Sequence, residues 1–219
     1  RAGQPPGRLR SAPRAFAAQL MAVNGPMARS MRDIRLGLAV MSEGDPRDPT
    51  WVPAPLNPPP FNAPIGVAVA IDDALHPAIK ATLRRAASHL QDAGYDVEEL
   101  TPPEIDRIAA LWSDIGLAEL GALLRPLIAT IGDEGMQRFW EDLWELGGGP
   151  AIDLAKYQAA LRMREVLLTK WQVFMDTHPL ILLPSCGELS IPVGMDTQGR
   201  DAVARMLQPL KYQLANTVL

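Results

Sequence analysis

The run PIGVAVAID, residues 64–72, constrains the fold of this 219-residue chain more than any other feature. It is an almost unbroken stretch of small and β-branched apolar residues, which is typical of a strand buried on both faces of a parallel or mixed sheet. A helix with one apolar stripe is expected next, from His76-Pro77 to Gly94. The alternating YDVEEL, residues 95–100, then predicts a half-exposed strand. Together they predict a βαβ unit within an α/β fold, a mixed sheet flanked by helices.

Further helices and one more strand are expected on either side of this unit. Ser30 is placed to cap a helix over residues 31–41. LILLPSC, residues 180–186, has the composition of another buried strand. The last segment, 201–219, is helix-like but is interrupted by Pro209. Three other helices are predicted over residues 104–131, 136–146 and 153–176.

Two segments are predicted to be extended or loop-like. Residues 1–24 are rich in Pro, Gly and Arg and show little periodicity. Residues 45–63 contain seven prolines, too many for a helix or a central strand.

Composition argues against several classes of protein. A net charge of -4 gives no electrostatic reason to expect a nucleic-acid partner. No apolar run approaches the length of a membrane span, so no membrane partner is expected. The single cysteine excludes an intrachain disulfide and favours a cytoplasmic location. Three histidines without ligand spacing indicate no metal site, and no cofactor motif is present.

The residues that could carry chemistry do not form a recognisable set. His178 and Cys186 could be a base and a thiol, but a lone cysteine in apolar surroundings is more often inert. The triple glycine 147–149 lacks the pattern of a phosphate-binding loop. The carboxylates of Glu141, Asp142 and Glu145 are typical of a solvated helix face. These residues alone therefore indicate no function.

Two neighbouring segments carry a family resemblance. GPMARSMRDIRLGLAVM, residues 25–41, followed by GDPRDPTWVP, residues 44–53, resembles the amidase signature family of serine hydrolases, which cleave amide bonds. Five further segments follow in the family's order: PIGVAVAIDD, AGYDVEEL, HPLILLPSCGE, PVG and QLANTVL. The resemblance therefore covers nearly the whole chain. DPTWVP and PVGMDTQGRDAVARML are similar to bacterial broad-range amidases acting on small amides. The resemblance implies the family's α/β fold, with residues 1–219 as the C-terminal part of a single amidase-type α/β domain. It also implies a small-molecule amide as substrate.

The resemblance suggests a structural role for Gly25, Pro26, Arg29 and Asp33. Gly25-Pro26 allows the backbone to turn sharply. Arg29 stands four residues before Asp33, which would place both on one helical face, where a guanidinium can bridge a carboxylate and loop carbonyls. Two alternatives stay open for this segment: a capped surface helix with one ion pair, or a direct role in substrate binding. We favour a structural role, in which the segment positions the turn and takes no part in catalysis.

The resemblance also predicts that no residue here is catalytic. The family uses a lysine, a serine in a cis peptide and a nucleophilic serine in a Gly/Ser-rich signature. None of the seven serines has that context: Ser11, Ser30, Ser42, Ser88, Ser113, Ser185 and Ser190. In the family order the catalytic segment lies upstream of Arg1. We therefore expect the 219 residues alone to be inactive. We also expect them to be prone to aggregation, poorly ordered at the N-terminus, or held by another chain.

The chain after the late strand helps to bound the substrate cleft in this family. Pro184, Ser185, Cys186 and Gly187 are thus the predicted substrate-binding residues. Trp112 or Trp140 could add an apolar wall. The expected protein partner is a second copy or the remaining part of the same protein. Two other functions stay open: a non-catalytic binding or scaffold module derived from an amidase, and an amidotransferase-type subunit acting with partners.

Overall fold

The computed structural model describes residues 15–45, 48, 51–57 and 64–219 of the chain. The chain divides into two compact units, residues 1–61 and 62–219. That the residues form part of a single α/β domain stays a prediction. The boundary falls within the proline-rich segment 45–63, whose seven prolines lack the backbone N–H group that a strand needs to pair in a sheet. None of the described helices combines the length and the apolar character that crossing a membrane requires.

Among its described residues, the first unit contains two helices, α1 (Phe16–Met21) and α2 (Met31–Met41). The sequence predicts loop or extended chain throughout residues 1–24, and this prediction is wrong for residues 16–21, which form α1. Its sequence FAAQLM consists mostly of good helix formers, and Ala17 within it is buried. Residues 1–14 of the same prediction lie outside the described residues.

Helix α2 has the predicted bounds because its cap forms. The Ser30 hydroxyl accepts a hydrogen bond from the Asp33 N–H at 3.2 Å. Residues 45, 48 and 51–57, the described part of the second predicted loop, contain neither helix nor strand. Within that loop the Trp51 indole donates to the Ser42 carbonyl at 3.0 Å, and it packs on Gly44. Residues 46–47, 49–50 and 58–63 lie outside the described residues.

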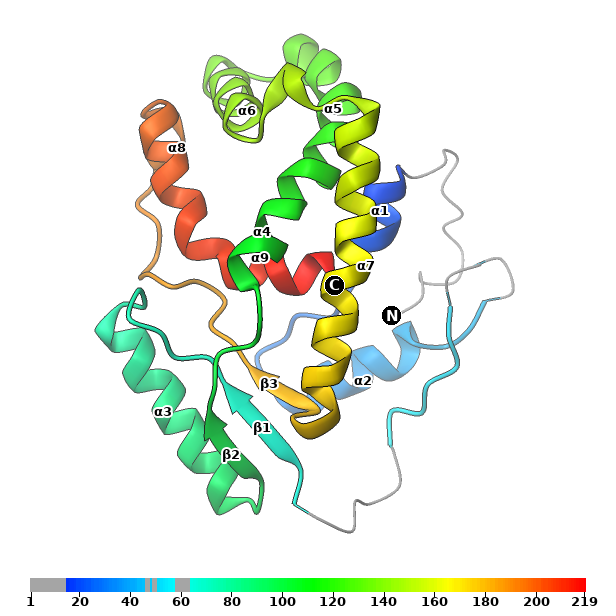
Figure 1. The fold of residues 1–219 in the computed structure, drawn as a ribbon, viewed down its shortest axis with the longest axis vertical. Coiled ribbons are helices and arrows are strands. Elements are labelled where there is room, and N and C mark those ends of the chain that lie inside the picture. The colour runs from blue at the N-terminus through cyan, green and yellow to red at the C-terminus, as the bar shows by residue number, and fades with distance from the viewer. Residues whose placement is uncertain (1–14, 46–47, 49–50, 58–63) are drawn as a thin grey trace. The chain divides into compact units, whose positions relative to one another are not determined.

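The second unit has a three-stranded parallel sheet in the order β2-β1-β3 (Figure 1). The strands are β1 (Gly66–Val69), β2 (Asp96–Glu99) and β3 (Leu180–Leu182). In the register, Val67 of β1 lies opposite Val97 on one side and Leu180 on the other. Because β1 lies between two neighbours, Val67, Ala68 and Val69 are buried, as the apolar run predicts. The α/β class is confirmed, and every described strand pair is parallel.

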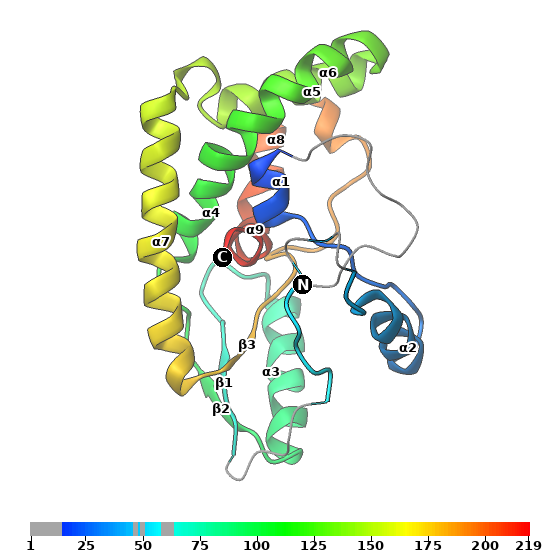
Figure 2. The ribbon, with the colours of Figure 1, turned by 90° about the vertical axis from the view of Figure 1, so that its right-hand side faces the viewer.

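Helix α3 (Pro77–Asp92) connects β1 to β2 and completes the predicted βαβ unit. His76 caps its start, since the ring Nδ1 accepts from the Ala78 N–H at 3.2 Å. The helix is followed by Gly94 with φ +91°, a backbone conformation that favours glycine. Figure 2 shows α3 on one side of the sheet and the end of α7 (Leu154–Thr177) on the other.

The helix predicted over residues 104–131 is divided in three. It forms α4 (Ile105–Leu111), the π-helical segment η1 (Trp112–Leu117) and α5 (Ala118–Ile131). The break predicted at Pro209 is confirmed: α8 (Arg200–Leu207) ends there, and the short 3₁₀ turn η4 (Gln208–Leu210) leads into α9 (Lys211–Val218). The other elements are α6 (Glu134–Leu146) and the 3₁₀ turns η2 (Gly149–Ala151) and η3 (Met195–Thr197).

The core of this unit lies where α4 packs along α9. Ile108 of α4, together with Ala215 and Val218 of α9, is completely excluded from solvent. Leu167 of α7 is equally buried. Arg164 of α7 donates to the Val218 carbonyl at 2.6 Å, which ties the end of α9 to α7. This packing fixes α9 beside the carboxyl end of the sheet.

Candidate functional site

A cavity of about 650 Å³ opens beside the carboxyl ends of β1 and β3. The order β2-β1-β3 places the partners of β1 on opposite sides, so the sheet has a switch point at this edge. In open α/β sheets such a crevice is the usual ligand site. Five parts of the unit line the cavity: the loop after β1, α4, the loop after β3, the end of α8 with η4, and α9.

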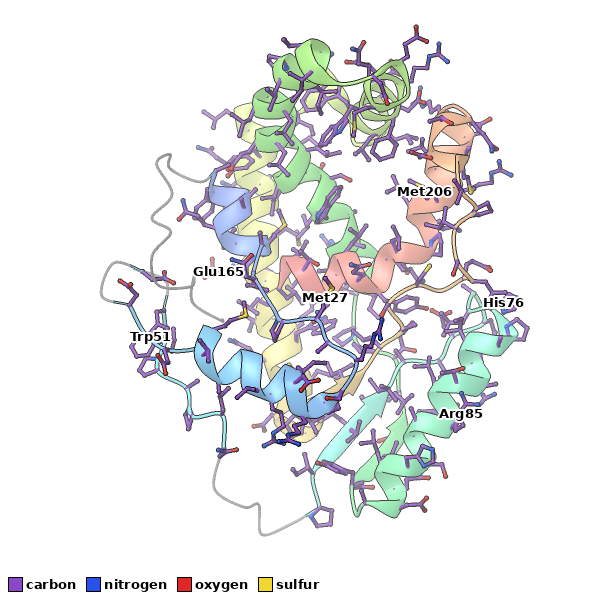
Figure 3. All side chains as sticks on the ribbon, turned by 180° about the vertical axis from the view of Figure 1, so that it is seen from behind. Met27, Trp51, His76, Arg85, Glu165 and Met206 are labelled. Carbon is purple, nitrogen blue, oxygen red and sulfur yellow. The ribbon has the colours of Figure 1, made fainter. Side chains whose placement is uncertain are left out.

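The loop after β3 is held in place through Gly187. Its N–H donates to the Pro209 carbonyl at 2.7 Å, and its own carbonyl accepts from the His76 N–H at 2.8 Å. A Cβ at this position would lie 3.3 Å from Leu75 Cδ2, so a larger residue would press on the cavity wall. Figure 3 labels His76 at the start of α3 and Met206 on α8, on the two segments that this loop approaches.

A polar cluster supports one wall of the cavity. The Tyr212 hydroxyl of α9 donates to Asp72 Oδ2, and Asp72 Oδ1 accepts from the Ala74 N–H at 2.9 Å. Lys211 Nζ lies 3.4 Å from the same Asp72 oxygen and 3.1 Å from Asp106 Oδ1 of α4. The cluster therefore joins the end of β1 to α4 and α9.

The cluster holds its groups in fixed ionisation states. Burial by itself would raise the pKa of Asp72, but the Tyr212 hydroxyl, the Lys211 charge and the Ala74 N–H together lower that pKa below 3.8. Burial and the neighbouring Asp72 carboxylate raise the pKa of Tyr212 well above its ordinary value of 10.0. At neutral pH Asp72 is thus ionised and Tyr212 protonated. These two groups are suited to positioning rather than to proton transfer.

The remainder of the cavity combines apolar walls with two further charges. Leu75, Leu207 and Leu214 are among its apolar lining residues. Glu188 lies on the loop after β3 and Arg205 on α8, and both side chains are exposed. An apolar cavity with a few converging polar groups is typical of a small-molecule site.

Of the four predicted substrate-binding residues, Gly187 lines this cavity. Pro184 is buried, Ser185 is exposed and Cys186 is half-buried, and they are not among the lining residues. As substrate contacts, all four remain predictions. Neither suggested tryptophan lines the cavity, although Trp140 borders another one of about 560 Å³ near α6.

Four residues, Gly25, Pro26, Arg29 and Asp33, are predicted to have a structural role. The structure differs from that prediction in the relation between Arg29 and Asp33. Helix α2 begins at Met31, so Arg29 precedes the cap, and no ion pair joins it to Asp33 among the described residues. The helical i,i+4 geometry therefore does not apply. Pro26 packs against Gly37 of α2, where an added Cβ would lie 3.0 Å from the proline Cβ. Gly25 has open space around it, and its structural role stays a prediction.

The described residues contain no serine hydrogen-bonded to a lysine. All four lysines lie against carboxylates: Lys80–Asp73, Lys156–Asp114, Lys170–Glu104, and Lys211 with Asp72 and Asp106. His178 contacts Glu98 at 3.2 Å and Thr177 at 3.0 Å, so its ring nitrogens are used away from Cys186. Over the described residues, no cluster of potential ligands could hold a metal ion.

Sequence reasoning missed the main polar groups of the cavity. Asp72 could have been found, because a carboxylate directly after a buried strand lies at the carboxyl edge of its sheet. Lys211 and Tyr212 gave no such signal, since helical periodicity marks a buried face and does not identify what it contacts. Arg205 and Glu188 resemble ordinary surface charges in the sequence.

Comparison with known proteins shows which family this chain resembles in sequence. Residues 7–218 match the family model described as Amidase. The chain is 37% identical over 178 residues to an indoleacetamide hydrolase of Bradyrhizobium diazoefficiens, a match covering 80% of this chain and 34% of the relative. The corresponding enzyme of Bradyrhizobium japonicum is 36% identical over 80% of this chain and 38% of its own length.

A solved structure supports the same fold. The structure of a fatty acid amide hydrolase matches with a TM-score of 0.63 and 21% identity, over 95% of this chain and 39% of that one. The chain thus spans little more than a third of the length of these proteins. Both the sequence match and the fold agree with the resemblance carried by residues 25–53. The chain belongs to the amidase family.

Proposed function

We propose that this chain forms the substrate-binding part of an enzyme that hydrolyses a carboxylic amide to an acid and ammonia or an amine. The family match and the identity to two indoleacetamide hydrolases support this function. The observation that carries it is the cavity at the switch point, which combines apolar walls with a small fixed polar cluster. A small uncharged amide with an apolar body suits such a site.

The proposed reaction proceeds through an acyl-serine intermediate. A serine attacks the amide carbonyl, the amine leaves with a proton, and water then releases the acid. Backbone N–H groups near the nucleophile would stabilise the oxyanion. We place the nucleophile and its lysine outside these 219 residues. Each lysine here lies against a carboxylate, and a positive charge held in an ion pair does not serve as a base.

Ammonia release from indoleacetamide tests this assignment. The assay compares the 219-residue chain alone with a longer polypeptide that carries these residues together with a Gly/Ser-rich amidase signature. We expect turnover only from the longer polypeptide. Turnover by the short chain that follows the protein through purification would refute the placement of the nucleophile.

A cavity-filling variant tests whether substrate uses this site. Ala110 lines the cavity and is exposed, so Ala110→Trp should fill the space without disrupting the core. In the longer polypeptide we expect at least a tenfold lower kcat/KM, about 1.4 kcal/mol. Ala159→Trp, on an exposed position of α7 that does not line the cavity, is the matched control. Equal activity of the two variants would exclude the cavity as the substrate site.

A further inference from the structure

The outer face of helix α5 carries no charged residue. Every residue of this helix that is exposed to solvent is apolar, apart from Thr130. The largest of them are Leu123, Leu127 and Ile131, which are 61%, 49% and 72% exposed. Helix α3, by contrast, exposes charged residues such as Arg85, which is labelled in Figure 3. An apolar face of this kind, here called the α5 face, marks an interaction surface.

The polar side chains of α5 are bound to groups of the same unit. Arg125 Nη2 lies 3.0 Å from Glu141 Oε2 of α6. Glu119 accepts a hydrogen bond from the Tyr157 hydroxyl of α7. The Thr130 hydroxyl donates at 2.9 Å to a backbone carbonyl one turn earlier in α5. The α5 face therefore offers a partner apolar surface, with no charge and no free side-chain donor.

The α5 face combines a ridge with a groove. Leu123, Leu127 and Ile131 are spaced by four residues, so they form one continuous ridge along the helix. The neighbouring row has smaller side chains and forms a shallow groove: Ala122, Pro126 and Thr130. A second copy of the chain, related by a two-fold axis at Leu127, presents the same ridge and the same groove. Each ridge then packs into the groove of the other copy, as an isologous contact requires.

We propose that the α5 face is the contact between two copies of this chain, with Leu127 at the two-fold axis. An apolar face without donors or charges is complemented by another apolar face, and a second copy supplies one of matching shape. Figures 1 and 2 show α5 at the end of the second unit that lies away from the sheet. The contact therefore leaves the cavity at the carboxyl edge of the sheet open.

A lipid surface is the other apolar partner to consider, and helix α6 argues against it. This helix packs against α5. Its charged residues are four carboxylates and one guanidinium: Glu134, Glu141, Asp142, Glu145 and Arg138. Helices that lie on anionic lipid carry lysine and arginine on their polar side, so an acidic neighbour disfavours that partner.

The size of the α5 face sets the strength of the contact. A helix of 14 residues is about 21 Å long and about 10 Å wide, so half of its surface is roughly 350 Å². Met136 of α6, which is 48% exposed beside Gly132, extends the face. Two copies would bury about 800 Å², less than the roughly 1,200–2,000 Å² of a stable complex. We therefore expect a weak, reversible dimer with a Kd of roughly 0.1 mM.

Sedimentation equilibrium of the 219-residue chain at pH 7, from about 10 µM to about 1 mM, measures this association. We expect monomer at the lowest concentration and mostly dimer at the highest. Leu127→Lys should raise the Kd at least tenfold (roughly), because two ammonium groups would meet at the axis without a partner. Val173→Lys is the matched control, since Val173 of α7 is 70% exposed and lies outside the α5 face. It should leave the Kd unchanged, and circular dichroism checks that both variants fold.

Cross-linking tests the position of the two-fold axis. In a chain that also carries Cys186→Ala, Leu127→Cys places one thiol beside the same thiol of the second copy. Mild oxidation should then give a disulfide-linked dimer. Val173→Cys in the same background is the control and should stay mostly monomeric.

Several outcomes would overturn this inference. They are monomer throughout the concentration range, equal Kd values for Leu127→Lys and Val173→Lys, and no more cross-linking of Leu127→Cys than of Val173→Cys. Binding to phosphatidylcholine–phosphatidylglycerol vesicles that Leu127→Lys abolishes would identify lipid as the partner instead. A longer polypeptide that stays monomeric where the 219-residue chain dimerises would show that the rest of the protein covers this face. Amide hydrolysis by the longer polypeptide is measured separately and does not depend on any of these results.

Discussion

Replacing Tyr212 by phenylalanine tests whether the polar cluster fixes α9 to the sheet. The Tyr212 ring is buried and would remain, whereas its hydroxyl bond to Asp72 would be lost. Hydrogen bonds to charged groups contribute about 1.5–3 kcal/mol. Asp72 keeps the Ala74 N–H and Lys211 as partners, so we expect a loss near the middle of that range, about 2 kcal/mol.

The assay is urea unfolding of the 219-residue chain, supported by thermal melts. A loss of about 2 kcal/mol lowers the Tm of a unit of this size by roughly 4–8 °C. Tyr95→Phe is the matched control, because no hydrogen bond or ion pair of the Tyr95 side chain is present among the described residues. It should change stability by less than about 0.5 kcal/mol.

A double-mutant cycle that combines Tyr212→Phe with Asp72→Asn isolates the interaction energy between these two side chains. We expect a coupling energy of about 1–2 kcal/mol between the two positions. If Tyr212→Phe is no more destabilising than Tyr95→Phe, or if the cycle gives no coupling, the cluster does not hold α9 in place. The argument for a rigid cavity wall would then fail.

Two other predictions follow from the same structure. The pKa of Asp72 is lowered in the folded state, so the stabilisation that Asp72 provides is present above pH 3.8 and is lost as the pH falls further. The difference in stability between the wild-type chain and Asp72→Asn should therefore shrink below that pH. Unfolding titrations at several pH values measure this difference. Gly121 lies directly beneath the Trp144 ring, where a Cβ would overlap it, so Gly121→Ala should cost about 1–3 kcal/mol and shift the tryptophan emission. Gly25→Ala is the control, because its Cβ would meet nothing within 4 Å, and it should change stability very little. Equal losses of stability in Gly121→Ala and Gly25→Ala would contradict the close packing of Trp144 on Gly121.

Much of the fold could be predicted from the sequence because the signals are local. The β1 run is apolar at every position, and only a central strand buries both of its faces. Ser30 ends the coil before α2 through a hydrogen bond to a residue three positions away. Pro209 interrupts the last helix by removing a backbone donor. Each of these effects acts within a few residues.

The site required the tertiary structure because its residues are far apart in the chain. Tyr212 contacts Asp72 across 140 positions, and Lys211 meets two carboxylates from different elements. The sequence marks α9 as helical but does not say which element it packs against. Gly187 was predicted from the family order, yet its two backbone hydrogen bonds show why it lies at the cavity.

The amino-acid sequence by itself determined the α/β class, most helix bounds and the amidase family, since propensity, capping and apolar periodicity are properties of neighbouring residues. The tertiary structure alone decided which charges meet at the carboxyl edge of the sheet. Ion pairs and hydrogen bonds depend on separations of a few ångströms, and only the packing of α4, α8 and α9 sets those separations.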